Sequence, residues 1–359
     1  MARQFGNLYP HITTFSNLWN AWKRAAKGKR GQPNVAAFEY DLEHNLLALQ
    51  QALETQTWTP GPYYSFYILD PKRRLISAAP FRDRVVHHAL CNIIEPLFER
   101  TFIGDSYANR KGKGTHRALD RAQQFARRYR YVFQADVRQF FPSIDHAVLR
   151  GILARKIADA PTLWLCDQIL RSGEGVLSEE YEMVWFPGDD LLAATRPRGL
   201  PIGNLTSQFW GNVYLNELDQ FVKRRLRVRA YLRYVDDFLL FADDKPTLWR
   251  WRKAILDFLP TLRLTLHEGS STVYPVRNGI PFLGWRIFPD HRRLLRRNGV
   301  AFQRRYRRLR RAYARGEVSA ERVAQAVQGW IAHVQHGQTW GLRRALLAPP
   351  LVPPERNRL

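Results

Sequence analysis

The sequence has little of what marks secreted and membrane proteins. Cys91 and Cys166 are the only cysteines among 359 residues, and each lies in an apolar segment with helical spacing. This argues against a disulfide framework or a zinc site and favours core packing in a reducing cytosol. No apolar run approaches the roughly 20 residues that a membrane span needs. Residues 1–10 lack the basic and then apolar pattern of a secretory signal. We therefore expect a cytoplasmic protein without a membrane partner.

Acidic residues are scarce relative to basic ones. The chain has 56 Lys and Arg against 32 Asp and Glu, which gives a formal net charge of +24 and a pI near 10.5. Such an excess predicts a polyanionic partner. Because the basic residues alternate with aromatic ones across a globular sequence instead of forming one amphipathic anchor, nucleic acid is favoured over membrane. The hydrophobic content of 45% is enough for a large core divided into subdomains.

The most informative stretch is residues 231–241, where two apolar, aromatic-rich runs meet at Asp236 and Asp237. The pattern predicts a β-hairpin with the acids at its tip. Rigid carboxylates of this kind suit a hard divalent cation such as Mg²⁺. The alternative is plain turn chemistry, since Asp is a common turn former. A second Asp-Asp pair, Asp243 and Asp244, shows the structural alternative. It precedes Lys-Pro and is interpreted as a loop and the start of a helix.

Asp136 ends a predicted buried strand at residues 131–137. An acid at such a position often caps a helix, and Asp145 is a candidate cap for the helix predicted at 146–157. If the fold brings Asp136 beside Asp236 and Asp237, three carboxylates can hold two Mg²⁺ ions roughly 3.5–4 Å apart. Mn²⁺ is an alternative to Mg²⁺. Two ions so placed activate a 3′-hydroxyl and stabilise a leaving pyrophosphate.

Several other segments carry charge. Residues 63–78 predict a basic-tipped hairpin, and residues 104–116 form a glycine-spaced basic loop that lacks the spacing of a phosphate-binding P-loop. The turn at 199–204 leads into a helix predicted at 205–226. Residues 173–198 concentrate acids and are interpreted as a surface insertion. The region 292–311 is dense in arginine, and its later half predicts a basic-faced helix that lies on a phosphate backbone.

Taken in order, these segments resemble a known family. Residues 234–237, Tyr-Val-Asp-Asp, resemble the Tyr-x-Asp-Asp signature of reverse transcriptases, and the stretch beginning at Asp136 is similar to their first metal-binding palm motif. Residues 72–76, 81–86, 107–110 and 282–285 are similar to the fingers, early palm and primer-grip motifs of group II intron-like enzymes. The resemblance extends over about residues 10 to 340.

The resemblance implies an α+β right-hand polymerase with helical fingers, an antiparallel-sheet palm and a helical thumb. We expect the N-terminal region and fingers at residues 1–130, with palm elements interleaved from about residue 80. The palm is expected at 131–290 with the acidic insertion at 173–198. A basic helical thumb is expected at 291–345 and a tail at 346–359.

One motif narrows the family. Residues 200–208 are similar to the Ile-Gly-x-x-x-Ser-Gln form found in enzymes of diversity-generating retroelements, where most reverse transcriptases have Gln-Gly-x-x-x-Ser-Pro. This implies error-prone copying of a template-repeat RNA into cDNA, with mutations at template adenines, in a bacterial, archaeal or phage setting. The implied partners are that RNA, dNTPs, the RNA–DNA hybrid and a basic accessory variability protein that forms an oligomer.

The resemblance also implies roles residue by residue. Asp136 and Asp236 ligate metal with the Val137 carbonyl, and Asp237 completes the acidic cluster. Phe141 excludes a ribose 2′-hydroxyl by bulk. The remaining assignments fall into three sets: nucleotide-binding Lys72, Arg74, Phe140, Ile202 and Gln208; the primer grip of Phe282, Leu283 and Gly284; and backbone-binding Arg110, Arg304, Arg305 and Arg308.

The chain departs from the family pattern at two places, and two alternative functions are considered. Many polymerases place a proton-donating lysine after the central hairpin, where this chain has His267, which either substitutes or is an ordinary surface histidine. The acidic insertion looks longer than is typical. The nearest alternative function is another bacterial reverse transcriptase, of the retron or antiphage type. An alternative of a different class is a non-catalytic RNA-binding scaffold, against which the intact Asp136, Asp236 and Asp237 argue.

Overall fold

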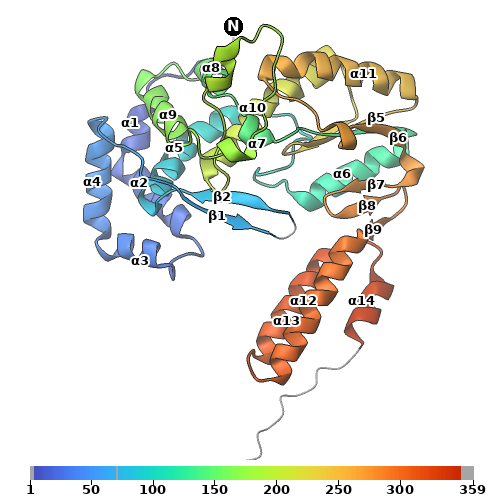
Figure 1. Cartoon of the computed structure of the whole chain (residues 1–359). Helices are drawn as coiled ribbons and strands as arrows, with labels where there is room; N and C mark the ends of the chain where they lie inside the picture. The colour runs from blue at the N-terminus through green and yellow to red at the C-terminus, as the bar shows by residue number, and fades with distance from the viewer. Residues whose placement is uncertain (1–3, 70–71, 349–359) are drawn as a thin grey trace, which may run out of the picture.

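The computed structural model describes residues 4–69 and 72–348 of the chain. Its N-terminal region is helical, with α1 Tyr9–Thr13, α2 Phe15–Ala26, α3 Pro33–Tyr40 and α4 Leu42–Glu54. These helices gather around the long helix α5, Phe81–Glu99 (Figure 1). The apolar side of α2, which includes Leu18 and Trp22, is buried there.

Two details of this region differ from the sequence prediction. Apolar spacing over residues 35–56 predicts a single helix, but the structure has two, because the backbone leaves the helical region at Asp41, with φ −127° and ψ 59°. The sequence also predicts a helix at 16–27 capped by Ser16, whereas α2 begins at Phe15 and its cap is Thr14. The Thr14 hydroxyl accepts a hydrogen bond from the Asn17 amide and so satisfies a free donor of the first turn.

Strands β1 (Tyr64–Ile68) and β2 (Arg74–Ala78) form the expected antiparallel hairpin, which projects from the helical region (Figure 1). The Asp70-Pro71 turn predicted there lies outside the described residues. Every residue of β1 is exposed, whereas β2 is partly buried, with Ser77 fully so.

The central sheet has the order β4-β5-β3-β6, and all its pairings are antiparallel. Its strands are β3 Tyr131–Asp136, β4 Tyr231–Tyr234, β5 Asp237–Ala242 and β6 Thr272–Pro275. Helix α10 (Leu205–Gln220) packs on α5, and α11 (Lys245–Phe258) and α6 (Thr115–Arg128) pack on the strands. A strand predicted at 263–266 is absent from the described sheet. Only an isolated bridge joins Leu266 to Val137.

Short helices connect β3 to α10. They are α7 Phe140–Ser143, α8 His146–Ala154 and α9 Ala160–Ser172. The Asp145 side chain accepts from the Val148 amide, which confirms the predicted cap of α8. The acidic insertion is ordered around two 3₁₀ turns, η1 Ser178–Glu180 and η2 Leu191–Thr195. The Arg263 guanidinium donates two hydrogen bonds of 2.8 Å to the Asp189 carboxylate in this insertion. These bonds connect the insertion to the segment that follows α11.

The C-terminal part begins with a small sheet and ends in helices. Strands β7 Ile280–Phe282, β8 Trp285–Ile287 and β9 Arg292–Leu294 precede α12 Arg296–Ala314, α13 Ala320–Val334 and α14 Trp340–Leu347. The helices extend away from the sheet (Figure 1). Phe302 of α12 stacks on Trp330 of α13 with ring centroids 3.9 Å apart. Strand β9 and helix α14 were not predicted. No helix in the described ranges combines the length and apolarity needed to span a bilayer.

The corrected cap of α2 gives a test of the fold. Replacing Thr14 with Ala should lower the free energy of unfolding by about 0.5–2 kcal/mol, because the Asn17 amide loses its acceptor. The control is Ser16→Ala, which removes the residue that the sequence favoured and should change stability by less than about 0.5 kcal/mol. Urea denaturation followed by circular dichroism measures both. An equal loss in the two variants contradicts the cap.

Candidate active site

The predicted hairpin of residues 231–241 is confirmed, with Tyr234 of β4 paired to Asp237 of β5. Its two-residue turn consists of Val235 and Asp236. Val235 has φ 55°, a left-handed conformation that a β-branched residue rarely adopts. Such a conformation costs of order 1–3 kcal/mol and persists only where the surroundings hold it. The tip of the hairpin is therefore a strained, fixed turn.

The fold brings the three aspartates to one end of the sheet. Asp136, the last residue of β3, lies directly opposite Asp237, the first residue of β5. The Val137 amide donates to the Asp236 carbonyl at 3.4 Å. His267, which follows the bridge at Leu266, donates its amide to the Asp136 carbonyl at 2.8 Å. Asp136 and Asp237, which are about a hundred positions apart in the sequence, are thus paired across neighbouring strands.

Burial and mutual repulsion perturb these carboxyls. Burial, together with the charge of Asp136, raises the pKa of Asp236 from its ordinary 3.8 to about 6. Burial and the charges of both other aspartates raise the pKa of Asp237 to about 7. The pKa of Asp136 is also raised, mainly by burial. Three ionised carboxylates here need positive charge nearby.

Two basic side chains of the fingers hairpin supply part of that charge. Lys72 lowers the pKa values of Asp136 and Asp237, and Arg74 lowers those of Asp136 and Asp236, so both act against the effect of burial. Both side chains are exposed. The hairpin formed by β1 and β2 therefore faces the acidic end of the sheet.

A pocket of about 380 Å³ opens at Asp236 and Asp237, and Asp136 is not among the residues that line it. Its lining brings together residues from the fingers hairpin, α7, the turn before α10, the central hairpin and the β7–β8 turn, namely Arg74, Phe140, Phe141, Pro142, Ile202, Tyr234, Val235, Asp236, Asp237 and Leu283. Gly211 of α10 supports the two phenylalanines from behind. A methyl group there would approach the ring of Phe140 to 3.2 Å and that of Phe141 to 3.4 Å.

The turn before α10 presents Ile202 to this pocket, and a buried asparagine fixes it. The Asn204 side chain accepts from the Ala79 amide and donates to the carbonyls of Ser77 and Pro201. The Ser77 amide donates to the Ile202 carbonyl at 2.8 Å. Gln208 is exposed on α10 and does not line the pocket. The sequence analysis missed Asn204, although an asparagine directly before a predicted helix was a visible signal.

The β7–β8 turn consists of Leu283 and Gly284, with φ 48° and 87°. Leu283 lines the pocket, whereas Phe282 is buried in the core. The Gly284 carbonyl accepts from the Leu295 amide at 3.0 Å and from the Asn298 side chain at 3.1 Å. The predicted primer grip is therefore tied to the first turn of α12.

The arginines predicted to bind a nucleic-acid backbone divide into two groups. Arg304, Arg305 and Arg308 are exposed on α12. Arg110 does not fit its predicted role, because only 7% of its side chain is exposed and it bonds to Glu99 and to the carbonyls of Ile103 and Ser106. It holds the 104–114 loop in place instead of reaching a phosphate.

The sequence analysis also missed a buried ion pair beneath the hairpin. Arg233 of β4 and Asp219 of α10 are both fully buried, with Nη2 and Oδ2 2.7 Å apart. An arginine inside an apolar strand was the available signal, since a buried charge needs a partner. Its acidic partner could not be identified before the fold was known.

The donor set fits a hard divalent cation. Carboxylate oxygens are the ligands that Mg²⁺ and Mn²⁺ prefer, and the raised pKa values show that ionised Asp136, Asp236 and Asp237 lack sufficient compensating charge. Within residues 4–69 and 72–348, no three acidic, histidine or cysteine side chains converge closely enough to form a finished metal site. The carboxylates must adjust their side-chain positions to share an ion.

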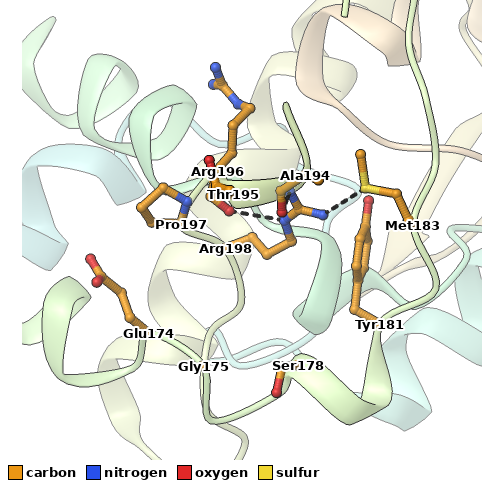
Figure 2. Close-up of a pocket in the computed structure, with 10 residues that line it drawn as sticks. All are labelled: Glu174, Gly175, Ser178, Tyr181, Met183, Ala194, Thr195, Arg196, Pro197 and Arg198. Atoms are coloured by element: carbon orange, nitrogen blue, oxygen red, sulfur yellow. Dashed lines mark hydrogen bonds between the residues drawn. The ribbon is translucent and has the colours of Figure 1, made fainter. Parts of the chain in front are cut away.

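A second pocket, of about 360 Å³, lies within the acidic insertion (Figure 2). Arg198 forms one side of it, bonded to the Ala193, Ala194 and Arg196 carbonyls. Its guanidinium lies 4.5 Å from the Tyr181 ring. None of the three aspartates lines this pocket. Both of its arginines have internal partners, since Arg196 bonds to the Asp145 carboxylate.

Residues 70–287 match the family described as reverse transcriptase (RNA-dependent DNA polymerase). The chain belongs to this family. The expected RNA-directed DNA polymerase and its α+β right-hand fold are thereby confirmed. In this reverse transcriptase, the matched residues include the fingers hairpin from residue 72 onward, the central sheet and the pocket described above.

The chain is also similar to individual known proteins and to a solved structure. Protein YkfC of Escherichia coli (strain K12) is 25% identical over 294 residues, which are 71% of this chain and 74% of that protein. Group II intron-encoded protein LtrA of Lactococcus lactis subsp. cremoris is 27% identical over 183 residues, 50% of this chain and 28% of LtrA. The chain thus spans little more than a quarter of LtrA. Apo telomerase from Candida Tropicalis aligns with a TM-score of 0.47 and 12% identity, covering 70% and 60% of the two chains.

The raised pKa values predict a pH-dependent stability in the absence of divalent ions. In the unfolded chain these aspartates ionise near 3.8, whereas Asp236 and Asp237 ionise at about 6 and about 7 in the fold. Their contribution to stability is therefore fully present below about pH 4 and lost as the pH rises through 6 and 7. Thermal unfolding of metal-free protein should show the midpoint falling over this range, and Mg²⁺ should restore it most at pH 8.

The control is the double variant Asp236→Asn/Asp237→Asn, which keeps the shape of the turn and removes both titrations. Its unfolding midpoint should vary less with pH than that of the wild type, and Mg²⁺ should stabilise it less. Parallel pH curves for the two proteins contradict the assignment of the raised pKa values to this pair.

Proposed function

We propose that Asp136, Asp236 and Asp237 form the metal-dependent active site for RNA-templated DNA synthesis in this reverse transcriptase. The observation that carries the proposal is the pairing of Asp136 with Asp237 in strand register, next to a pocket that Asp236, Asp237 and the basic Arg74 line. Two bound Mg²⁺ ions would activate the primer 3′-hydroxyl and stabilise the leaving pyrophosphate. Asp136 and Asp236 hold the ions with the Val137 carbonyl, and Asp237 adds charge to the cluster.

The other pocket residues act on the substrate. Lys72 and Arg74 balance the charge of the triphosphate, because they already act electrostatically on the aspartates. Phe141 limits the space beside the sugar and excludes a ribose 2′-hydroxyl, with Phe140 packed against it at 5.2 Å between ring centroids. Leu283 and Gly284 hold the primer end. The exposed Arg304, Arg305 and Arg308 contact the backbone of the RNA–DNA hybrid.

We further propose that this enzyme serves a diversity-generating retroelement, copying a template-repeat RNA with errors at adenines. Support comes from Ile202 lining the nucleotide pocket within the Ile-Gly-x-x-x-Ser-Gln motif. An isoleucine offers no hydrogen bond to the incoming nucleotide, so base selection depends more on shape, which discriminates weakly. A basic accessory protein is the expected partner of such an enzyme.

The role of the acidic cluster predicts a large loss of activity. Asp236→Asn should reduce Mg²⁺-dependent primer extension on an RNA template by at least about 100-fold, because one ligand of the shared site is removed. Asp243→Asn, in the neighbouring Asp-Asp pair, is the matched control and should retain activity, since Asp243 is exposed and outside the pocket. A fully active Asp236→Asn variant contradicts the proposed site.

The role of Ile202 predicts a change in error pattern rather than in rate alone. Ile202→Gln should lower misincorporation opposite template adenines, because a glutamine can hydrogen-bond the incoming nucleotide. Sequencing of cDNA made by both proteins on one adenine-rich RNA measures this. Ile202→Val, which keeps the side chain apolar, should leave the pattern unchanged. If Ile202→Gln does not alter adenine errors, the proposed basis of infidelity is wrong.

The wild-type cDNA also separates the retroelement from its neighbours. Errors concentrated at template adenines support the retroelement assignment. Accurate cDNA, or a long product made without a template, favours a retron or antiphage type of enzyme.

A further inference from the structure

An arginine lies beneath the strained turn of the catalytic hairpin. Arg233 and Asp219 are each 0% exposed. The Arg233 Nε donates to Asp219 Oδ1 at 2.8 Å, and its Nη2 donates to Oδ2 at 2.7 Å. This two-point contact fixes the plane of the guanidinium as well as its position.

The remaining donor atom of the guanidinium, Nη1, bonds to two further groups. It donates to the Val235 carbonyl at 2.8 Å and to the Asn212 side chain at 3.2 Å. The Tyr231 hydroxyl donates to Asp219 Oδ1 at 2.7 Å. The network therefore joins β4 and α10 to the residue whose backbone is strained.

The same network reaches the segment before α6. The Arg233 amide donates to the Asp105 carbonyl at 3.0 Å, and the Tyr107 amide donates to the Arg233 carbonyl at 3.0 Å. Asn212 donates to the Ala108 carbonyl at 2.9 Å. The segment before α6, β4 and α10 thus meet around Arg233, the first through its backbone and α10 through its guanidinium.

The free-energy cost of burying these two charges indicates that the ion pair has a role beyond stabilising the fold. Burying two charges costs several kcal/mol per ion, and hydrophobic residues of similar volume often serve stability equally well. What apolar residues cannot supply is a donor to the Val235 carbonyl. That carbonyl belongs to the turn that carries Asp236, so its position sets the position of the carboxylate.

We propose that Arg233, oriented by Asp219, is a positioning residue that holds the Val235–Asp236 turn in its strained conformation and thereby sets the geometry of the metal-binding carboxylates. This inference rests on the proposed function of Asp236. It adds that the metal site also requires Arg233, which lies beneath the turn and outside the pocket. Arg233 itself contacts neither substrate nor metal.

The test removes both charges together, so that no unpaired ion is left buried. Arg233→Met/Asp219→Leu is compared with Arg263→Met/Asp189→Leu, which removes another arginine–aspartate pair with two hydrogen bonds of 2.8 Å. That pair joins the acidic insertion to the segment after α11, and Asp145, which also lies 3.4 Å from Arg263, keeps Arg196 as its partner. Primer extension on an RNA template is measured at varied dNTP and varied Mg²⁺, alongside thermal unfolding.

For the Arg233 pair we expect kcat to fall at least about tenfold, the Mg²⁺ concentration for half-maximal rate to rise at least about threefold, and KM for dNTP to change little. The Arg263 pair should keep the wild-type Mg²⁺ dependence. A purely structural loss lowers the active fraction without shifting the Mg²⁺ requirement, so this shift identifies positioning. A wild-type kcat and Mg²⁺ dependence in the Arg233 double variant overturns the proposal.

Arg233→Lys keeps the test decisive if the double variant does not fold. A lysine preserves the positive charge opposite Asp219. Its single ammonium group cannot bond to the Asp219 carboxylate and the Val235 carbonyl in the way that the planar guanidinium does. We expect a folded protein with an increased Mg²⁺ requirement, and an unchanged requirement contradicts the proposal. A fully active Asp236→Asn variant contradicts the proposed site itself. A fully active Arg233 variant beside an inactive Asp236→Asn variant contradicts only the role of Arg233.

Discussion

The carboxylates of Asp136, Asp236 and Asp237 repel one another at the end of a buried sheet, and much of the surrounding structure holds them there. Burial raises the pKa values of all three, and repulsion by neighbouring aspartates raises those of Asp236 and Asp237 further. The turn that carries Asp236 is strained at Val235 and is fastened from below by Arg233. The site therefore has little stability of its own, and a bound cation is predicted to stabilise it.

The pocket is also the place where separate parts of the chain are joined. The Ser77 amide bonds to the Ile202 carbonyl and so ties the fingers hairpin to the turn before α10. The Asn298 side chain bonds to the Gly284 carbonyl and ties α12 to the β7–β8 turn.

The sequence was informative where the pattern was local. The central hairpin, the strand ending at Asp136 and the Asp145 cap follow from apolar alternation and turn chemistry. Ion pairs between different elements could not be predicted, because nothing in the sequence around Arg233 identifies Asp219 as its partner and nothing around Arg110 identifies Glu99. Arg110 was consequently predicted to bind phosphate although it is buried and paired. Conversely, Gln208 belongs to a recognisable motif and yet is exposed outside the pocket.

The central claim is that acids from distant segments act as one metal site. Mn²⁺ binding measured by electron paramagnetic resonance, with an RNA–DNA primer-template and a non-incorporable nucleotide present, tests this most directly. Asp136→Asn should weaken Mn²⁺ binding as strongly as Asp236→Asn, because both carboxylates hold the same ions. Undiminished Mn²⁺ binding by the Asp136→Asn variant would contradict the account.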